Sequence, residues 1–361
     1  MTQKVPKLKD IAQKAGVSLA TTSLILRDEG NALKFKSETR KRVQDIANEL
    51  GWRQNLLVKS IQTGKSKTIG VLVPPYDSFW SNVLVGIHRG LAGQDYMPIT
   101  LWRADQVSED DFLPNDADGV FGKSDEGMNL INRLMDRRVE GVIVWPTMAE
   151  RYHKCLDDLA NRGIPVVLVD HEYSDQSRMG SVITDEECGS RLAAGHLLGL
   201  GHRNIAFLTE APLKTRTWQV LREKYFQEAI LECPDATYSK WELNRADQDA
   251  VKVAKELLGS PERPTAVFCS TDHEAQDLYW AALEMGIRIP EDISVVGYSD
   301  LQFAATMRPP LTTVHQRPRE IGEKAAALVI DGLNSPDATE AVNAKIACEL
   351  IVRGSTLPHG V

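Results

Sequence analysis

The sequence predicts a small all-α helix-turn-helix domain followed by an α/β core of two doubly wound parallel sheets. Three observations predict this fold class. Two short helical patterns flank Gly16, and strand-like apolar runs alternate with helical patterns from Thr68 onward. The charge is also uneven: residues 1–68 hold fourteen Lys or Arg against six Asp or Glu, a net +8, whereas the whole chain of 361 residues carries −8. A basic segment on an acidic body is typical of a nucleic-acid-binding module joined to another domain.

The first segment reads as two helices joined by a tight turn. Apolar residues at positions 8, 11, 12 and 15 follow the spacing of one helical face, Gly16 allows the bend, and Ser18 is suited to cap the second helix. Val17, Thr22, Ile25 and Leu26 are expected to face the first helix, which leaves the other side of the second helix for a DNA major groove. A helical hairpin that only packs is the alternative at this point.

A third helix and a short amphipathic run follow. The third helix is expected to open at Lys36 and Ser37, to carry an apolar stripe at positions 43, 46, 47 and 50, and to close at Gly51. The run from Leu56 to Gln62 comes after Trp52–Asn55 and precedes Thr63–Lys65.

This order resembles the LacI/GalR (lactose-repressor) family of transcription regulators. The family has a helix-turn-helix, a third helix, an aromatic-x-Pro-Asn turn and a hinge helix before a periplasmic-binding-protein-like core. Four later strings, at 194–208, 289–300, 309–316 and 349–356, are also similar to the family's own. The resemblance implies a ligand-responsive repressor of carbohydrate-utilisation genes that binds a pseudo-palindromic DNA operator as a homodimer. The DNA contacts it implies are Ser18, Leu19, Ala20, Thr21, Ser23, Leu24, Arg27, Lys36, Asn55, Val58 and Ile61.

The remaining chain predicts strands at 69–73, 98–102, 141–145, 164–169, 181–184, 204–208, 265–269 and 293–297. Their rhythm indicates two sheets divided near residue 175, and the string at 309–313 resembles the family's crossover back into the first sheet. The expected domains are 1–54 for DNA binding, 55–68 for the hinge, 69–175 with 305–330 for the first core subdomain, and 176–304 with 331–361 for the second.

Ligands of doubly wound sheets bind beyond the carboxyl ends of the strands. Carboxylate and guanidinium groups suit sugar hydroxyls there, and aromatic rings suit the apolar face of a sugar. The expected effector-binding residues are Tyr76, Phe79, Trp80, Trp145, Asp170, Arg222, Asp272, Ser299 and Gln316. Alternatives remain open: Asp170 and Asp272 as helix caps, Arg222 paired with Glu223, and both tryptophans as core. His196 and His202 are expected to be structural.

Three positions depart from the family pattern, and two segments extend it. Leu24 stands where many members have a base-reading Arg, Gln54 where Pro is usual, and Ser299 where some sugar-binding members have Asp. The segment 28–36 is about three residues longer than usual, and it is either a surface loop or a carrier of phosphate contacts at Lys34 and Lys36. The acidic segment 103–127 is either a solvated loop or a cover over the ligand cleft.

The sequence carries no recognisable catalytic motif, so we expect no enzyme, no cofactor and no metal site. Five scattered cysteines, no membrane-length apolar run and a polar start indicate a cytoplasmic protein. Two other functions stay open. One is a regulator of the same fold that responds to a purine or a protein corepressor. The other is a sugar-binding transport protein, which the basic head opposes.

Overall fold

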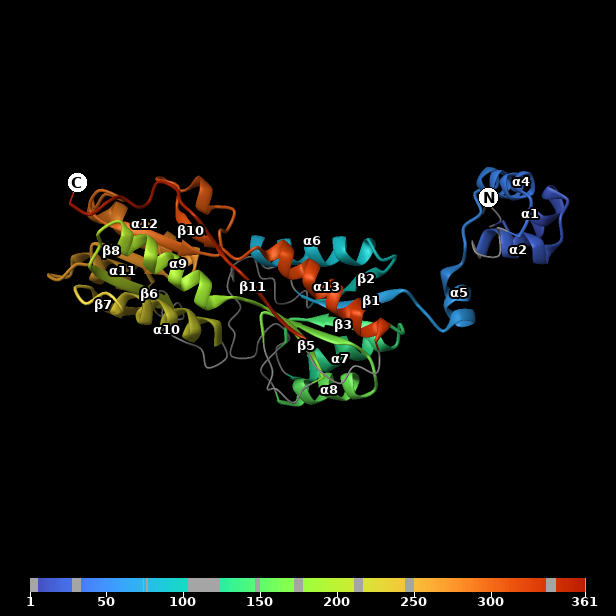
Figure 1. Cartoon of the computed structure of the whole chain (residues 1–361), viewed down its shortest axis with the longest axis horizontal. Coiled ribbons are helices and arrows are strands. Elements are labelled where there is room, and N and C mark those ends of the chain that lie inside the picture. The colour runs from blue at the N-terminus through green and yellow to red at the C-terminus, as the bar shows by residue number, and fades with distance from the viewer. Residues whose placement is uncertain are drawn as a thin grey trace. The chain divides into compact units, whose positions relative to one another are not determined.

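The computed structural model describes residues 6–27, 34–73, 75, 77–102, 124–146, 150–171, 178–210, 217–243, 250–335 and 342–360. The chain divides into two compact units, Met1–Ser66 and Lys67–Val361, each with its own core (Figure 1). No helix in the described ranges has the length and apolar character that a membrane span requires.

The first unit is entirely helical, with α1 (Leu8–Ala15), α2 (Leu19–Arg27), α4 (Ser37–Glu49) and α5 (Leu56–Thr63). Gly16 closes α1 in the left-handed region at φ 65°, a conformation that costs glycine no steric strain. The Ser18 hydroxyl accepts a hydrogen bond from the Thr21 amide at 3.0 Å, so the predicted cap of α2 is confirmed. The core joins three helices through Ile11, Ala15, Ile25, Val43 and Ala47.

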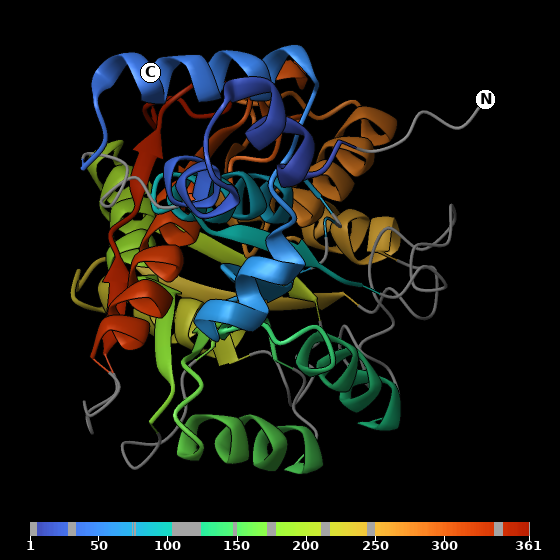
Figure 2. The same cartoon turned by 90° about the vertical axis from the view of Figure 1, so that its right-hand side faces the viewer.

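The second unit contains two six-stranded sheets. The first sheet has the order β11-β5-β4-β3-β1-β2, and all its pairings are parallel. Helices α6 (Ser78–Ala92) and α13 (Pro318–Asn334) pack side by side on one face, and α7 (Ser124–Met135) and α8 (Glu150–Asn161) cover the other (Figures 1 and 2). Its strands are β1 (Thr68–Leu72), β2 (Met97–Thr100), β3 (Gly141–Val144), β4 (Val166–Val169), β5 (Gly180–Thr184) and β11 (Asn343–Ile346).

The second sheet has the order β12-β10-β9-β8-β6-β7, with only the β10–β12 edge pairing antiparallel among the described strands. Helices α9 (Glu186–Gly199) and α10 (Thr217–Leu231) pack on one face, and α11 (Ala250–Gly259) and α12 (Asp272–Met285) on the other. A short 3-10 helix, η3, spans Ala304–Thr306. The strands are β6 (Asn204–Glu210), β7 (Thr237–Leu243), β8 (Ala266–Cys269), β9 (Ser294–Tyr298), β10 (Thr312–His315) and β12 (Glu349–Ile351).

The division of the sheets near residue 175 is wrong. Strand β5 belongs to the first sheet, because it pairs with β4 on one side and β11 on the other and buries Val182 in that sheet's core. The string at 309–313 was also misplaced, since β10 pairs with β9 in the second sheet. The chain therefore crosses between the sheets after β5, after β10 and between β11 and β12. The predicted segments 305–330 and 331–361 each contribute to both sheets or to the helices that cover them.

Candidate functional site

The outer side of α2 carries the side chains expected to meet DNA bases. Leu19 is 53% exposed and Leu24 39%, although both are apolar. Ala20 is also exposed, whereas Thr21 and Ser23 are half-buried. Ser18, which precedes α2, and Lys36, which precedes α4, are also exposed. The helix ends at Arg27, whose side chain lies outside the described part, as do residues 28–33 of the long loop.

Helix α5 presents apolar side chains to solvent. The Asn55 side-chain oxygen accepts a hydrogen bond from the Val58 amide at 3.3 Å, which caps the helix. Val58 is 37% exposed and Ile61 77% exposed. Exposing such a side chain forgoes the free energy of burying it, so a surface of this kind favours an interaction partner.

The second unit buries an ion pair between α10 and α9. Arg222 and Glu186 are 2% and 6% exposed, and the guanidinium donates to both carboxylate oxygens, at 2.8 and 2.9 Å. A third N–H of Arg222 bonds the backbone carbonyl of Ser270. Such a pair is stable only if hydrogen bonds satisfy its remaining polar atoms. Glu223, the expected alternative partner, instead lies 2.8 Å from the ammonium of Lys240.

Tyr298, at the end of β9, holds this ion pair from a second side. Its hydroxyl donates to Glu186 at 2.8 Å, and its ring lies 3.4 Å below the guanidinium carbon of Arg222. A Cβ atom at Gly189 would lie 2.2 Å from the Tyr298 oxygen, so only glycine permits this approach to α9. Burial and the neighbouring Glu186 raise the pKa of Tyr298 well above its ordinary value, which keeps the hydroxyl a donor.

Two polar side chains beside Arg222 have no hydrogen-bond partner in the described structure. Gln219 precedes Arg222 by three residues on α10, a spacing that places both side chains on one helix face. Its amide nitrogen and oxygen are both buried without a partner, and so is the hydroxyl of Ser270. The two residues are 3% and 0% exposed. Buried polar atoms of this kind call for a specific explanation, such as a bound molecule.

Asp170, at the end of a strand in the first sheet, interacts electrostatically with Glu186 and Arg222 of the second sheet's helices. It follows β4 in the left-handed backbone region at φ 56°, and its amide bonds the carbonyl of Val182. Burial and the negative charge of Glu186 raise its pKa to about 7, while Arg222 opposes the rise. Asp170 and Arg222 are therefore electrostatically coupled although they come from different sheets.

Aromatic residues gather at the same end of the first sheet. Trp145 follows β3, the neighbour of β4, and its ring centroid lies 4.5 Å from that of Trp80. Trp145 is half-buried, whereas Phe79 and Trp80 are buried in the α6–α13 core. Asp77 caps α6 by accepting from the Trp80 amide at 2.9 Å. Tyr76 lies outside the described residues, and so does 103–123 of the acidic segment.

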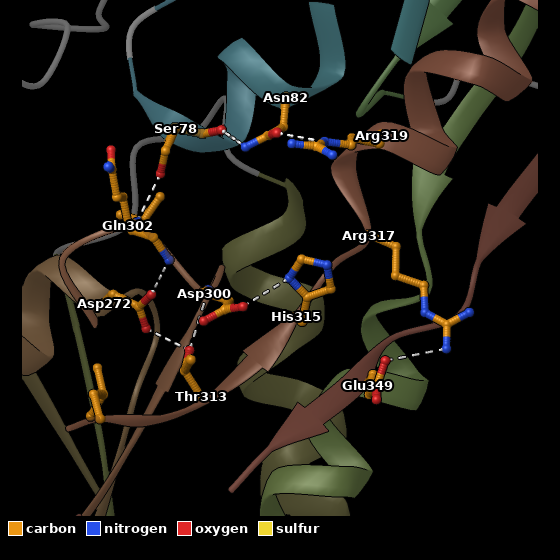
Figure 3. A network of polar contacts seen from close by, with 12 residues as sticks. Ser78, Asn82, Asp272, Asp300, Gln302, Thr313, His315, Arg317, Arg319 and Glu349 are labelled. Carbon is orange, nitrogen blue, oxygen red and sulfur yellow. Dashed lines mark hydrogen bonds and ion pairs between the residues drawn. The ribbon is translucent and has the colours of Figure 1, made fainter. Parts of the chain in front are cut away.

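Asp272, another expected effector residue, belongs to a second polar network (Figure 3). Asp272 is completely buried, and its two oxygens accept from the Leu301 amide and the Thr313 hydroxyl, both at 2.6 Å. Burial still raises the pKa of Asp272 to about 7. Both oxygens of the carboxylate that was expected to bind effector thus accept hydrogen bonds from the protein itself.

Two separate hydrogen bonds also link the two sheets. The Ser78 hydroxyl, at the start of α6, accepts from the Gln302 amide at 3.0 Å (Figure 3). The Gln316 amide, just after β10, donates to the Thr184 hydroxyl of β5 at 3.0 Å. Ser299 has φ 104° and bonds Val314 through its amide. Gln316 therefore lies after β10, where the chain crosses back to the first sheet, whereas Ser299 lies between β9 and β10 of the second sheet.

Comparison with known proteins finds a matching family model in each of the two units. The model described as bacterial regulatory proteins of the lacI family matches residues 7–55, and that of the periplasmic binding protein-like domain matches 194–356. The HTH-type transcriptional repressor PurR of Vibrio vulnificus is 30% identical over 351 residues, 96% of this chain and 97% of that protein. The chain belongs to the LacI family. The resemblance to this family that the sequence analysis identified is confirmed.

Solved structures of LacI-family members show the same fold. The lac repressor dimer bound to operator and the anti-inducer ONPF has a TM-score of 0.75 and 24% identity, covering 98% of this chain and all of that one. A LacI family transcriptional regulator from Enterococcus faecium with bound ribose has 27% identity and a TM-score of 0.63, covering 81% of this chain and 99% of that one.

Sequence reasoning missed Glu186 and Gln219, whereas Tyr298 was a candidate because it follows a predicted strand. Glu186 looked like an ordinary acidic residue in the first turn of a helix, where the helix dipole favours it. Gln219 had no pattern to mark it. Only the structure shows that Arg222 is buried on α10, and a buried cation requires a carboxylate partner such as Glu186.

Proposed function

We propose that this LacI-family chain is a repressor that binds a pseudo-palindromic operator as a homodimer and responds to a small sugar-like effector. Helix α2 would read the major groove through Leu19, Ala20 and Leu24, and α5 would insert Ile61 into the minor groove. The hinge would span residues 55–68. The exposure of Ile61 and the +8 charge of the first 68 residues support this assignment.

The effector would bind against Asp170 and Arg222, with Gln219 and Ser270 completing the polar contacts. The observation that carries this part is the Gln219 amide, buried beside Arg222 without a partner; in support, the charges of Glu186 and Arg222 act on Asp170 of the other sheet. A ligand that bonds groups from both sheets binds one arrangement of the sheets better than another, and only such a difference shifts a population. Half-buried Trp145 would supply an apolar face. The Enterococcus relative with bound ribose supports the sugar class.

The test uses the full-length chain. Operator sites are first selected from a random DNA pool, and binding is then followed by fluorescence anisotropy while a panel of free sugars and nucleobases is added. We expect a free sugar to change operator affinity at least tenfold. A response to nucleobases alone would replace the sugar class with a purine-like class, and a full panel without effect would reject the effector assignment.

A further inference from the structure

We infer that Glu186 restricts the effector to molecules without a negative charge, by neutralising Arg222 inside the effector site. This inference rests on the proposed effector site. It concerns which chemical class of ligand that site accepts, and it assigns the selectivity to one side chain of this chain.

The first step is the occupation of Arg222. A guanidinium has five N–H donors in a fork that fits a carboxylate or a phosphate. Glu186 takes two of them in the bidentate arrangement that an anionic ligand would use, and the Ser270 carbonyl takes a third. Two donors remain for an effector, and they no longer carry an unpaired positive charge.

The second step is the rigidity of Glu186. Its carboxylate also accepts from Tyr298 at 2.8 Å, and both residues are buried. Moving Glu186 aside would break three hydrogen bonds and leave a buried carboxylate without its cation, a change that is strongly unfavourable. An anionic ligand therefore cannot simply replace Glu186 on Arg222.

The third step is the charge that surrounds the site. Asp170 adds a second carboxyl group within electrostatic range of Glu186 and Arg222. One cation is thus paired with Glu186 and also acts on Asp170, so it does not balance the further negative charge of a phosphate or carboxylate on the effector. Gln219 and Ser270 offer neutral donors and acceptors, which suit hydroxyl, amide or amine groups.

The inference predicts that a free sugar is accepted and its phosphate ester is refused. It also predicts that the substitution Glu186→Gln frees Arg222 to bind an anion. Inorganic phosphate is the probe, because it needs no knowledge of the natural effector. A charge-assisted bidentate contact corresponds to roughly a tenfold or larger gain in affinity.

The experiment measures thermal stabilisation of the full-length chain by inorganic phosphate at constant ionic strength. We expect no phosphate-dependent shift for the unchanged chain or for Glu187→Gln, which alters an exposed neighbour paired with Arg191. Glu186→Gln should gain about tenfold in apparent phosphate affinity, and Glu186→Gln with Arg222→Met should lose that gain.

Phosphate binding to the unchanged chain as tight as to Glu186→Gln would overturn the inference, and so would a folded Glu186→Gln protein without the gain. If Glu186→Gln does not fold, the unchanged chain decides the question through glucose and glucose 6-phosphate. A measurable stabilisation by the phosphate ester, equal to or above that by glucose, would overturn the inference, and stabilisation by glucose alone would support it. The proposed function fails separately, when no neutral compound alters operator binding.

Discussion

Replacing Gln219 with leucine removes a buried amide whose nitrogen and oxygen have no partner among the described residues. An unsatisfied buried polar group costs about 1–3 kcal/mol, and an apolar side chain of similar size carries no such cost. Gln219 is 3% exposed, so nearly all of its side chain would pass from unpaired polar to buried apolar. We therefore expect Gln219→Leu to stabilise the ligand-free protein by roughly 1–3 kcal/mol.

The same substitution should abolish the effector response, because leucine can neither donate to nor accept from the ligand. Differential scanning calorimetry of the full-length chain gives the stability, and operator anisotropy gives the response. Gln227→Leu, on the same helix but half-buried, is the matched control and should change neither by more than about 0.5 kcal/mol. A destabilised Gln219→Leu protein, or one that keeps the full effector response, would refute the reasoning.

Four further outcomes are expected. Deleting residues 1–66 should abolish operator binding, and binding by the intact chain should weaken with salt by about −0.9 in log K per neutralised phosphate; both follow from affinity titrations. Ile61→Ala should weaken specific binding more than non-specific binding, because inserting an apolar wedge requires the operator's central step; equal losses would remove Ile61 from this role. Leu24→Arg should shift the preferred base towards guanine in site selection, because Leu24 is exposed and has no donor of its own; identical selected sites would contradict this. The pKa of Asp170 is raised from 3.8 to about 7 in the folded chain, so folding takes up a proton between those values and stability falls as pH rises through that range. Urea titrations at several pH values should show a smaller fall for Asp170→Asn.

Much of the fold could be predicted because it depends on local patterns. The helix-turn-helix followed from the spacing of four apolar positions, the left-handed Gly16 and the Ser18 cap, all of which act within a few residues. Interior strands such as β1, β3 and β8 followed from their apolar runs, since strands buried on both faces are continuously hydrophobic, whereas interior β10 has two threonines and was missed.

The membership of strands in the two sheets could not be predicted in the same way. Strand β5 lies in the first sheet because of its pairing with β4 and with β11, and β11 comes about 160 residues later in the chain. Edge strands such as β7 and β12 were missed, because their half-exposed sequences lack an apolar run.

The candidate site shows the same limit. Sequence position identified Asp170 and Arg222, and the structure places them on different sheets within electrostatic range. The sequence could not reveal that Arg222 forms an ion pair with Glu186, or that the Asp272 carboxylate accepts hydrogen bonds from Leu301 and Thr313. These contacts span 29 to 41 residues, and tertiary packing alone sets them.

The buried pair also decides which variant tests the site. Arg222→Ala would leave Glu186 as a buried charge without a partner, which typically costs 3–5 kcal/mol and would confuse loss of response with unfolding. Asp170→Asn avoids this difficulty, because burial raises the pKa of Asp170 to about 7, so the neutral carboxyl is already accessible near neutral pH and the substitution leaves no carboxylate without its cation.

The most direct test of the central claim compares operator release by the unchanged chain, Asp170→Asn and the exposed control Asp136→Asn, with the free sugar that the panel identifies. Moving a population from 1:99 to 99:1 needs about a 10⁴-fold preference of the ligand for one state, and hydrogen bonds to charged groups supply roughly 1.5–3 kcal/mol each. We predict that all three proteins bind operator equally well without sugar. Asp170→Asn should require at least tenfold more sugar for release, whereas Asp136→Asn should match the unchanged chain. Release of Asp170→Asn at the same sugar concentration as the unchanged chain would contradict the account.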